Sequence, residues 1–303
     1  MENRKWDWIY NGDLQMSVER VSMRQKPAER YRRYYWRILQ LRIIDDDFMR
    51  KVLADKDCVQ LVLRIIMEKP DLIVKEVNVQ FDMKNLQGRS LELDVLAVDG
   101  MGQLYDIEVQ RGDQKATPKR ARYHSALLDA NTSEPGEDFC RLPQNFVIFI
   151  TENDVLGGGL PVYHVERTIQ ENGEPFGDET HILYVNAKIQ DDTDLGRLMH
   201  DFMCRNPGEM NYKVLADRAK YFKETKKGVT SMCRMFEEVK EEGREECRAI
   251  FCRGLLDLLR DYGEVPDDLK KRIEGEKDMM KLSQWYRQAA HVNDIGDFMM
   301  GCE

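Results

Sequence analysis

The sequence has few cysteines and no long apolar run. Its seven cysteines are scattered along the chain without a CxxC pair, which is typical of reduced thiols and argues against a disulfide framework or a zinc knuckle. No segment approaches the roughly 20 apolar residues of a membrane-spanning helix, and the first residues lack the apolar core of a signal peptide. We therefore expect a cytoplasmic protein without membrane contacts.

The signatures of several common enzyme classes are also missing. The sequence contains no GxSxG, GxGxxG, GKS or GKT, which argues against a hydrolase nucleophile elbow and the usual phosphate-binding loops. Its five histidines show no metal-binding spacing such as HExxH, so we expect each to be a surface residue or a satisfied core residue. The three glycines at residues 157–159 are interpreted as a turn.

Positive charge is not in excess, because 46 Lys+Arg stand against 55 Asp+Glu and give a formal net charge of -9. This total argues weakly against a nucleic-acid partner, but the local distribution of charge matters more. A basic stretch with interleaved aromatic residues lies between residues 20 and 42, and it is either a solvated helix or an arm that contacts phosphates. A second basic patch comprises Lys115, Lys119, Arg120, Arg122 and His124.

The 303 residues, 42% of them hydrophobic, suit a globular protein with about two domains. We divide the chain into a basic N-terminal segment (1–44), a core (45–190), a helical extension with an acidic hinge (191–243) and a C-terminal helical region (244–303). Apolar spacing in the core predicts two short helices over residues 47–67 and another over 118–130. Strands are predicted over residues 73–81, 91–98, 104–109, 146–151, 162–168 and 182–185. This order indicates an α/β fold.

The C-terminal region is predicted to be helical almost without interruption. The acidic run at residues 237–246 is either a hinge or a solvated helix. The apolar stripe that follows comprises Cys247, Ile250, Phe251, Leu255, Leu258, Leu259 and Tyr262. We expect it to be covered by a matching set after Pro266, namely Leu269, Ile273, Met279, Leu282 and Trp285, with a homodimer through these helices as the alternative.

Two acids, Asp94 and Glu108, lie among apolar neighbours on the two arms of a predicted hairpin. Buried carboxylates need a cation or a raised pKa, and two of them on adjacent strands are natural ligands for Mg²⁺. If the numbers of paired residues add up to an even value near 202, Asp94 faces Glu108 with Cβ atoms about 4.5–5.5 Å apart. Gln110 then shares their face of the sheet, whereas an odd sum separates the two acids.

These residues are similar to the motif of the PD-(D/E)XK nuclease superfamily. The sequence resembles its bacterial branch of recombination-promoting nucleases, also called PD-(D/E)XK nuclease family transposases, roughly from residue 45 to residue 188. The matching pieces are residues 45–53 (DDDFMRKVL), the hairpin at 91–110 and residues 119–125 (KRARYHS). The resemblance implies a restriction-endonuclease-like fold, a mixed sheet flanked by helices, with an α-helical C-terminal region.

The resemblance also implies the roles of individual residues. Asp94 and Glu108 would bind the metal, Mg²⁺ with Mn²⁺ as a substitute, and Asp47 on the opening helix would be the additional acid, with Asp46 equally near. Gln110 stands where the superfamily motif has lysine, so it can orient water but supplies no charge. Lys119 or Arg120 would then supply the missing charge, and DNA would be bound by Lys119, Arg120 and Arg122.

Three functions are compatible with the sequence. The first is a Mg²⁺-dependent DNA endonuclease associated with recombination or mobile elements. The second is a nucleic-acid-binding module that keeps the nuclease fold without turnover, suggested by Gln110 and the acidic total charge. The third is a protein-interaction module in which the C-terminal helices recruit partners.

Overall fold

The computed structural model describes residues 27–85, 88–112 and 116–301. By their contacts they divide into two compact units, Met1–Met232 and Cys233–Glu303. The predicted basic residues before Pro27, and Lys115, lie outside the described residues. Within the described part of the chain, no helix has both the length and the apolar character needed to span a membrane.

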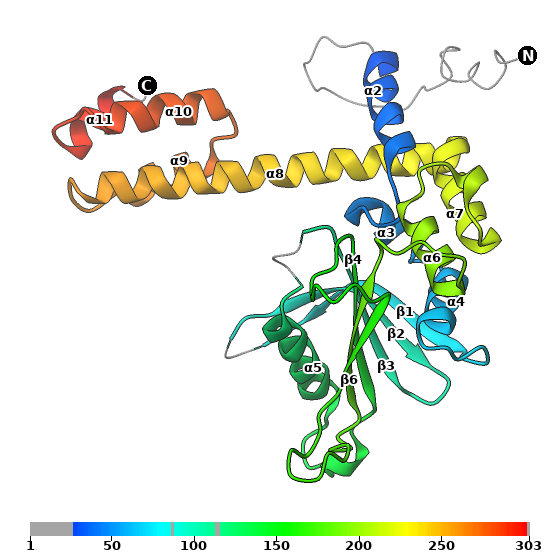
Figure 1. Ribbon diagram of the computed structural model, residues 1–303. Coiled ribbons are helices and arrows are strands. Elements are labelled where there is room, and N and C mark those ends of the chain that lie inside the picture. The colour runs from blue at the N-terminus through cyan, green and yellow to red at the C-terminus, as the bar shows by residue number, and fades with distance from the viewer. Residues whose placement is uncertain (1–26, 86–87, 113–115, 302–303) are drawn as a thin grey trace, which may run out of the picture. The chain divides into compact units, whose positions relative to one another are not determined.

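The first unit is built on a six-stranded mixed sheet with the order β1-β2-β3-β4-β6-β5 (Figure 1). Strands β1, β2 and β3 are antiparallel, β3, β4 and β6 are parallel, and β5 is antiparallel to β6. The central strands β3 and β4 are buried along their whole length, as expected of parallel strands covered on both faces. The strands are β1 (Val74–Met83), β2 (Leu91–Asp99), β3 (Leu104–Gln110), β4 (Asn145–Thr151), β5 (Val162–Val165) and β6 (Thr180–Asn186).

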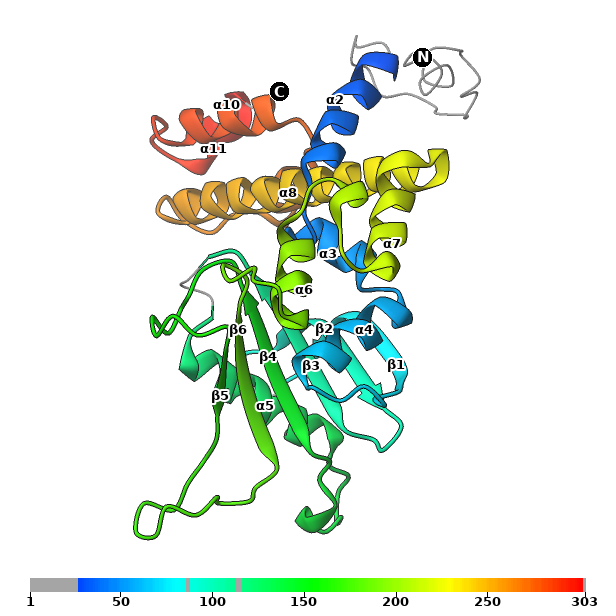
Figure 2. The same cartoon turned by 45° about the vertical axis from the view of Figure 1, so that its right-hand side comes forward.

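Helices cover both faces of this sheet. Figures 1 and 2 show α5 against one face and α4 and α6 against the other. Pro118 at the first helical position and Thr117, whose side chain accepts from the Arg120 N–H, begin α5. The helices of this unit are α2 (Pro27–Gln40), α3 (Asp46–Val52), α4 (Lys56–Ile66), α5 (Pro118–Thr132), α6 (Asp194–Met203) and α7 (Lys213–Glu224), with short 3₁₀ turns at Phe139–Arg141 and Pro207–Glu209.

The predicted mixed α/β architecture is therefore confirmed, with strand ends that differ from the predicted ones by at most three residues. The strand predicted over residues 162–168 ends at Val165. The predicted β2–β3 hairpin forms around a turn in which the Asp99 carboxylate accepts from the N–H groups of Met101 and Gln103. Gly102 has a φ of 82° in this turn, a conformation that glycine adopts without steric cost.

The second unit consists of helices and has its own hydrophobic core. Helix α8 (Lys226–Arg260) begins in the first unit and continues into the second, where it is followed by α9 (Asp267–Gly275), α10 (Met279–Ala289) and α11 (Ile295–Gly301). The acidic run at residues 237–246 is an almost fully exposed part of α8, which is the solvated-helix alternative. The buried core comprises Cys252, Leu255, Leu256, Leu259, Leu269, Ile273, Leu282, Trp285, Ala289 and Phe298.

The expected folding back of the last helices onto α8 is confirmed, but the predicted stripe is partly wrong. Ile250 and Phe251 are 67% and 37% exposed, and Cys247 is exposed as well. The buried face uses Cys252 and Leu256 instead. Apolar residues at neighbouring positions of α8 offer two overlapping stripes, and the sequence spacing alone does not choose between them.

Candidate functional site

The candidate site begins where β2 and β3 separate. Their ladder pairs Leu96 with Asp106 and ends at Val95 with Ile107, so paired residue numbers add up to 202. Beyond that pair, carboxylates replace backbone carbonyls as acceptors: Glu108 Oε1 accepts from the Asp94 N–H at 3.0 Å, and Asp94 Oδ2 accepts from the Val109 N–H at 3.0 Å. The even register is therefore the observed one, and Asp94 and Glu108 face each other where the two strands separate. We call this place, with its two carboxylates, the fork.

Gln110 lies beside this carboxylate pair. Its side chain is 8% exposed, and Nε2 donates to Glu108 Oε2 over 3.3 Å. Because side chains alternate along β3, Asp106, Glu108 and Gln110 all point to the face that carries α5. The structure thus brings together the hairpin residues that the sequence singled out.

Helix α5 brings a cation to the acids. Arg120 Nη2 lies 2.6 Å from Glu108 Oε2, and the Arg120 side chain is 29% exposed while that of Glu108 is fully buried. The guanidinium carbon lies 5.8 Å from the centre of the Phe149 ring on β4, within the range of a cation–π interaction. Arg120 therefore places a positive charge against Glu108, next to the uncharged Gln110.

Two further residues of the site were not predicted as such, Asp106 and His124. Both are fully buried, His124 Nδ1 lies 2.7 Å from Asp106 Oδ2, and Asp106 Oδ1 has no hydrogen-bond partner. His124 is thus a satisfied core residue, one of the two alternatives expected for the histidines, and it is buried away from the exposed cations of the second basic patch. The signal was present in the sequence, because strand alternation places Asp106 on the face of Glu108, and the spacing of four residues places His124 on the face of Arg120.

Burial and mutual repulsion shift the titration of these groups. Burial raises the pKa of Asp94 to about 6, and burial together with Asp106 and Asp94 raises the pKa of Glu108 to about 8. The pKa of Asp106 is raised well above its usual value, first by burial and then by Asp94. Burial lowers the pKa of His124, which favours the neutral ring. A cation at this point would relieve the repulsion among the acids.

The additional acid was expected at Asp47 or Asp46 on the opening helix α3. Asp46 is paired with Arg50 at 3.2 Å, and both of their charges act on the pKa of Asp94, which Asp46 raises and Arg50 lowers. The pKa of Asp47 is raised first by its own burial and then by Asp46. Of the two acids, Asp46 is therefore the one whose charge acts on the pKa of Asp94.

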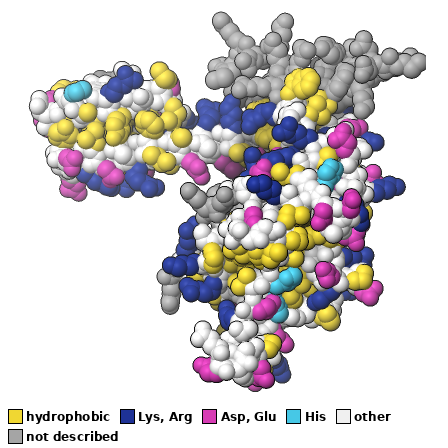
Figure 3. Space-filling view, in the orientation of Figure 1, with side chains coloured by type: hydrophobic (Ala, Val, Ile, Leu, Met, Phe, Trp, Pro, Cys, Tyr) yellow, Lys and Arg dark blue, Asp and Glu magenta, His cyan; other side chains and the backbone are white. Residues whose placement is uncertain are grey.

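The other predicted DNA-binding residues, Lys119 and Arg122, are exposed on α5. In the space-filling view, Lys and Arg side chains gather over the part of the first unit where α5 lies in Figure 1 (Figure 3). Arg111, which directly follows Gln110, is 58% exposed and pairs with Asp45 and Glu152. Exposed cations therefore flank the fork, although the chain as a whole is acidic.

Two overlapping sets of side chains could hold a divalent cation. Asp94 and Glu108 supply oxygen atoms alone, which suits Mg²⁺. Asp106, Glu108 and His124 each bring one ligand atom within 4.8 Å of the others, but both ring nitrogens of His124 are already engaged, by Asp106 and by Arg120. The first set is therefore the better one, and the unpartnered Asp106 Oδ1 beside it fits a site with excess negative charge.

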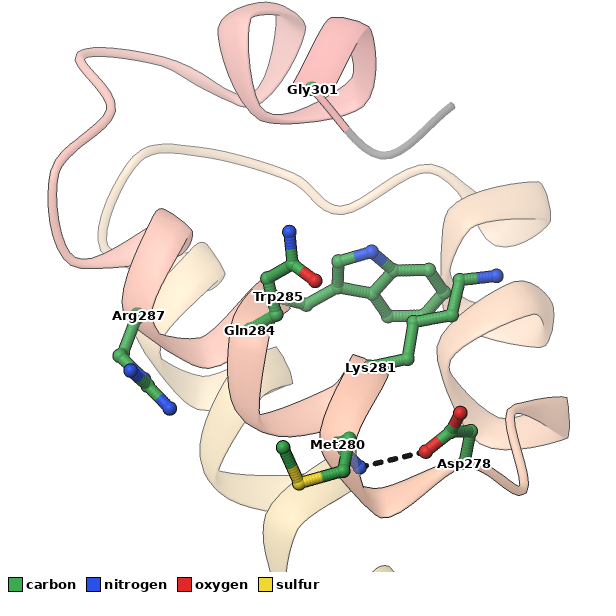
Figure 4. A pocket seen from close by; sticks show the side chains of 7 residues that line it. All are labelled: Asp278, Met280, Lys281, Gln284, Trp285, Arg287 and Gly301. Carbon is green, nitrogen blue, oxygen red and sulfur yellow. Dashed lines mark hydrogen bonds between the residues drawn. The ribbon is translucent and has the colours of Figure 1, made fainter.

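A separate surface cavity of about 610 Å³ lies in the second unit (Figure 4). Lys281 Nζ lies 5.0 Å from the centre of the Trp285 ring, and Asp278 accepts from the Met280 N–H at 2.8 Å, as expected at the beginning of α10. Asp278 is the one acid among the described residues that line this cavity, so these residues do not bring several carboxylates together as the fork does. The cavity is lined by Asp278, Met280, Lys281, Gln284, Trp285, Arg287 and Gly301.

Neither a protein-family model, nor a curated protein, nor a solved structure matches this chain.

Proposed function

We propose that this chain is a DNA endonuclease that hydrolyses phosphodiester bonds with Mg²⁺ as its cofactor. The observation that carries the proposal is the pair of carboxylates Asp94 and Glu108, which face each other where β2 and β3 separate. Two carboxylates at one point provide the oxygen ligands that Mg²⁺ prefers, with Mn²⁺ as a substitute. In the nuclease family that the sequence resembles, whose members are linked to recombination and mobile elements, these positions match the metal-binding acids.

In the proposed reaction, a water oxygen forms a bond to phosphorus, the bond from phosphorus to one sugar oxygen breaks, and that sugar oxygen takes up the proton that the water loses. The bound cation would supply charge neutralisation and acidify water. Gln110 orients its neighbours without adding charge. Arg120, which is permanently charged, offsets the negative charge that develops on the phosphate, and Lys119 and Arg122 contact flanking phosphates.

A DNA-binding protein without turnover is the second candidate. It is favoured by one observation: Glu108 Oε2 is occupied by both Arg120 and Gln110, so the carboxylate is satisfied without a metal. In that case the exposed cations on α5 would still bind phosphates, and the fork would serve only to hold α5 on the sheet.

Nicking of supercoiled plasmid separates the two candidates. The full chain is incubated with Mg²⁺, Mn²⁺, Ca²⁺ or EDTA, and we expect nicking with Mg²⁺ and Mn²⁺ alone. Asp94→Asn and Glu108→Gln should abolish nicking, whereas Asp82→Asn, an exposed carboxylate on β1, should leave it unchanged. Metal-independent DNA retention without nicking would support the second candidate, and full activity of either site variant would refute the site.

A further inference from the structure

A series of contacts connects Asp106 to Glu108, both on β3, through His124 and Arg120 of α5. His124 Nδ1 contacts Asp106 Oδ2 at 2.7 Å, the other ring nitrogen contacts Arg120 Nε at 3.1 Å, and Arg120 Nη2 contacts Glu108 at 2.6 Å. Asp106 and His124 are fully buried. Asp106 and His124 take no part in the proposed reaction, and the burial of two polar side chains needs a physical reason.

The donors in this series of contacts can be assigned from chemistry alone. A guanidinium group only donates, so His124 Nε2 accepts from the Arg120 Nε–H. The ring proton of a neutral histidine must then lie on Nδ1, where it is donated to Asp106 Oδ2. Asp106 thus fixes both the tautomer and the orientation of the ring, in the manner in which a carboxylate orients a histidine in a metal site or a catalytic triad.

We propose that Asp106 and His124 are positioning residues that hold the Arg120 guanidinium group between Glu108 and the phosphate of the substrate; this inference rests on the proposed nuclease function. Part of the Arg120 side chain reaches solvent, since 29% of it is exposed, and a phosphate would approach from there. Phe149 packs against both His124 and Arg120. The centre of its ring lies 5.8 Å from the centre of the His124 ring and 5.8 Å from the Arg120 guanidinium carbon.

The physical benefit is a cation that is ordered before the substrate arrives. An arginine side chain loses rotamer entropy when it is held in one conformation, and ordering it in advance removes that cost from phosphate binding and from the transition state. This matters more here than in a nuclease with lysine at the position of Gln110, because Gln110 adds no charge and Arg120 contacts Glu108 directly.

The test combines a double-mutant cycle with readouts that need no activity. We expect Arg120→Ala to lower the single-turnover nicking rate on the order of 100-fold and His124→Phe to lower it about tenfold. The double variant should be no slower than Arg120→Ala, because His124 acts through Arg120. Multiplied effects would overturn the proposal. His164→Phe, an exposed histidine on β5, is the matched control, and His124→Gln replaces His124→Phe if the latter lacks a cooperative melt.

Two measurements test the roles of Asp106 and His124 even if the parent protein does not nick DNA. They distinguish failure of this inference from failure of the proposed nuclease function. Nitrogen NMR of labelled histidine should show His124 neutral and protonated at Nδ1, and protonation at Nε2 would overturn the proposal. Mn²⁺ titration by calorimetry should find that His124→Phe still binds the ion, with an affinity reduced by no more than about 10–100-fold. Loss of Mn²⁺ binding would instead make His124 a metal ligand.

Discussion

Arg120 Nη2 lies 2.6 Å from Glu108 Oε2, in an ion pair that joins the exposed side of α5 to the central strand β3. The acid is fully buried and the arginine is partly exposed, so the pair connects the core to solvent. A divalent cation that binds Glu108 competes with this guanidinium group for the same carboxylate oxygen. The position of the Arg120 guanidinium group therefore depends on whether a divalent cation is bound to Glu108.

The first prediction concerns stability against pH without metal. The pKa values of Asp94 and Glu108 are raised to about 6 and about 8, whereas acids in the unfolded chain titrate near 4, roughly. Between these values the folded protein retains protons that the unfolded chain has released, so stability falls as pH rises. In EDTA the melting temperature should decrease from about pH 5 to about pH 8.5.

The double variant Asp94→Asn, Glu108→Gln should show a smaller decrease over the same pH range, because it lacks both titrating groups. Mg²⁺ should raise the melting temperature of the parent protein most at the alkaline end, since its ligands must be deprotonated. Asp82→Asn is the control and should follow the parent. Identical pH profiles for the parent and the double variant would contradict the raised pKa values.

The second prediction concerns Gln110. Gln110→Ala removes the 3.3 Å hydrogen bond to Glu108, and nicking should slow by roughly tenfold, the value of one hydrogen bond to a charged group. The loss should be smaller than that caused by Asp94→Asn. Gln110→Lys should require more Mg²⁺ for half-maximal nicking, because an ammonium group beside Glu108 competes with the cation. An alanine variant as fast as the parent would reduce Gln110 to a strand residue.

The third prediction concerns DNA affinity. Lys119 and Arg122 are exposed on α5, and removing one cation that binds a phosphate should reduce the slope of log affinity against log salt by about 0.9 for duplex DNA. Lys119→Ala combined with Arg122→Ala should therefore flatten the slope in a fluorescence-anisotropy titration. The matched control is Lys270→Ala with Lys271→Ala, two exposed lysines of α9. An unchanged slope for the α5 variant would remove this helix from the interface.

The fourth prediction separates the two units. Trp285 is 3% exposed within the core of the second unit, so Trp285→Ala should cost that unit about 3–5 kcal/mol of unfolding free energy. Met280→Ala, at a position that is 75% exposed, should change it by less than about 0.5 kcal/mol. Thermal melts followed by circular dichroism give both values. Plasmid nicking should survive Trp285→Ala, because the fork residues all belong to the first unit.

The β2–β3 hairpin could be predicted because its determinants are local. The turn at Asp99 and Gly102 fixes the register, and the register decides that Asp94 faces Glu108. For α5 the resemblance left Lys119 and Arg120 as alternatives, and the choice between them depended on the rotation of the helix about its axis, which is set by tertiary packing. Helix α5 buries His124 and Ser125 toward the sheet, so its hydrophobic pattern alone does not reveal which side faces the acids.

The C-terminal helices show the same limit in a different form. Leu255 and Leu259 were assigned correctly to the buried face of α8, whereas Ile250 and Phe251 were not. Two stripes share those leucines, and the choice between them depends on how the later helices pack. Sequence patterns thus predicted which segments meet more reliably than which side chains are enclosed between them.

The place of Glu108 in the sheet has a consequence for the order of folding. On one side its strand pairs with β2 through a tight hairpin, and on the other side it pairs in parallel with β4, opposite Phe149. The hairpin closes a short loop, whereas the pairing with β4 must wait until the whole α5 crossover is in place, at a greater cost in loop-closure entropy. We therefore expect Asp94 and Glu108 to meet early in folding, and Arg120 and His124, which contact Phe149, to arrive later. During refolding, the repulsion between Asp94 and Glu108 would then arise before the Arg120 guanidinium group is in place to offset it.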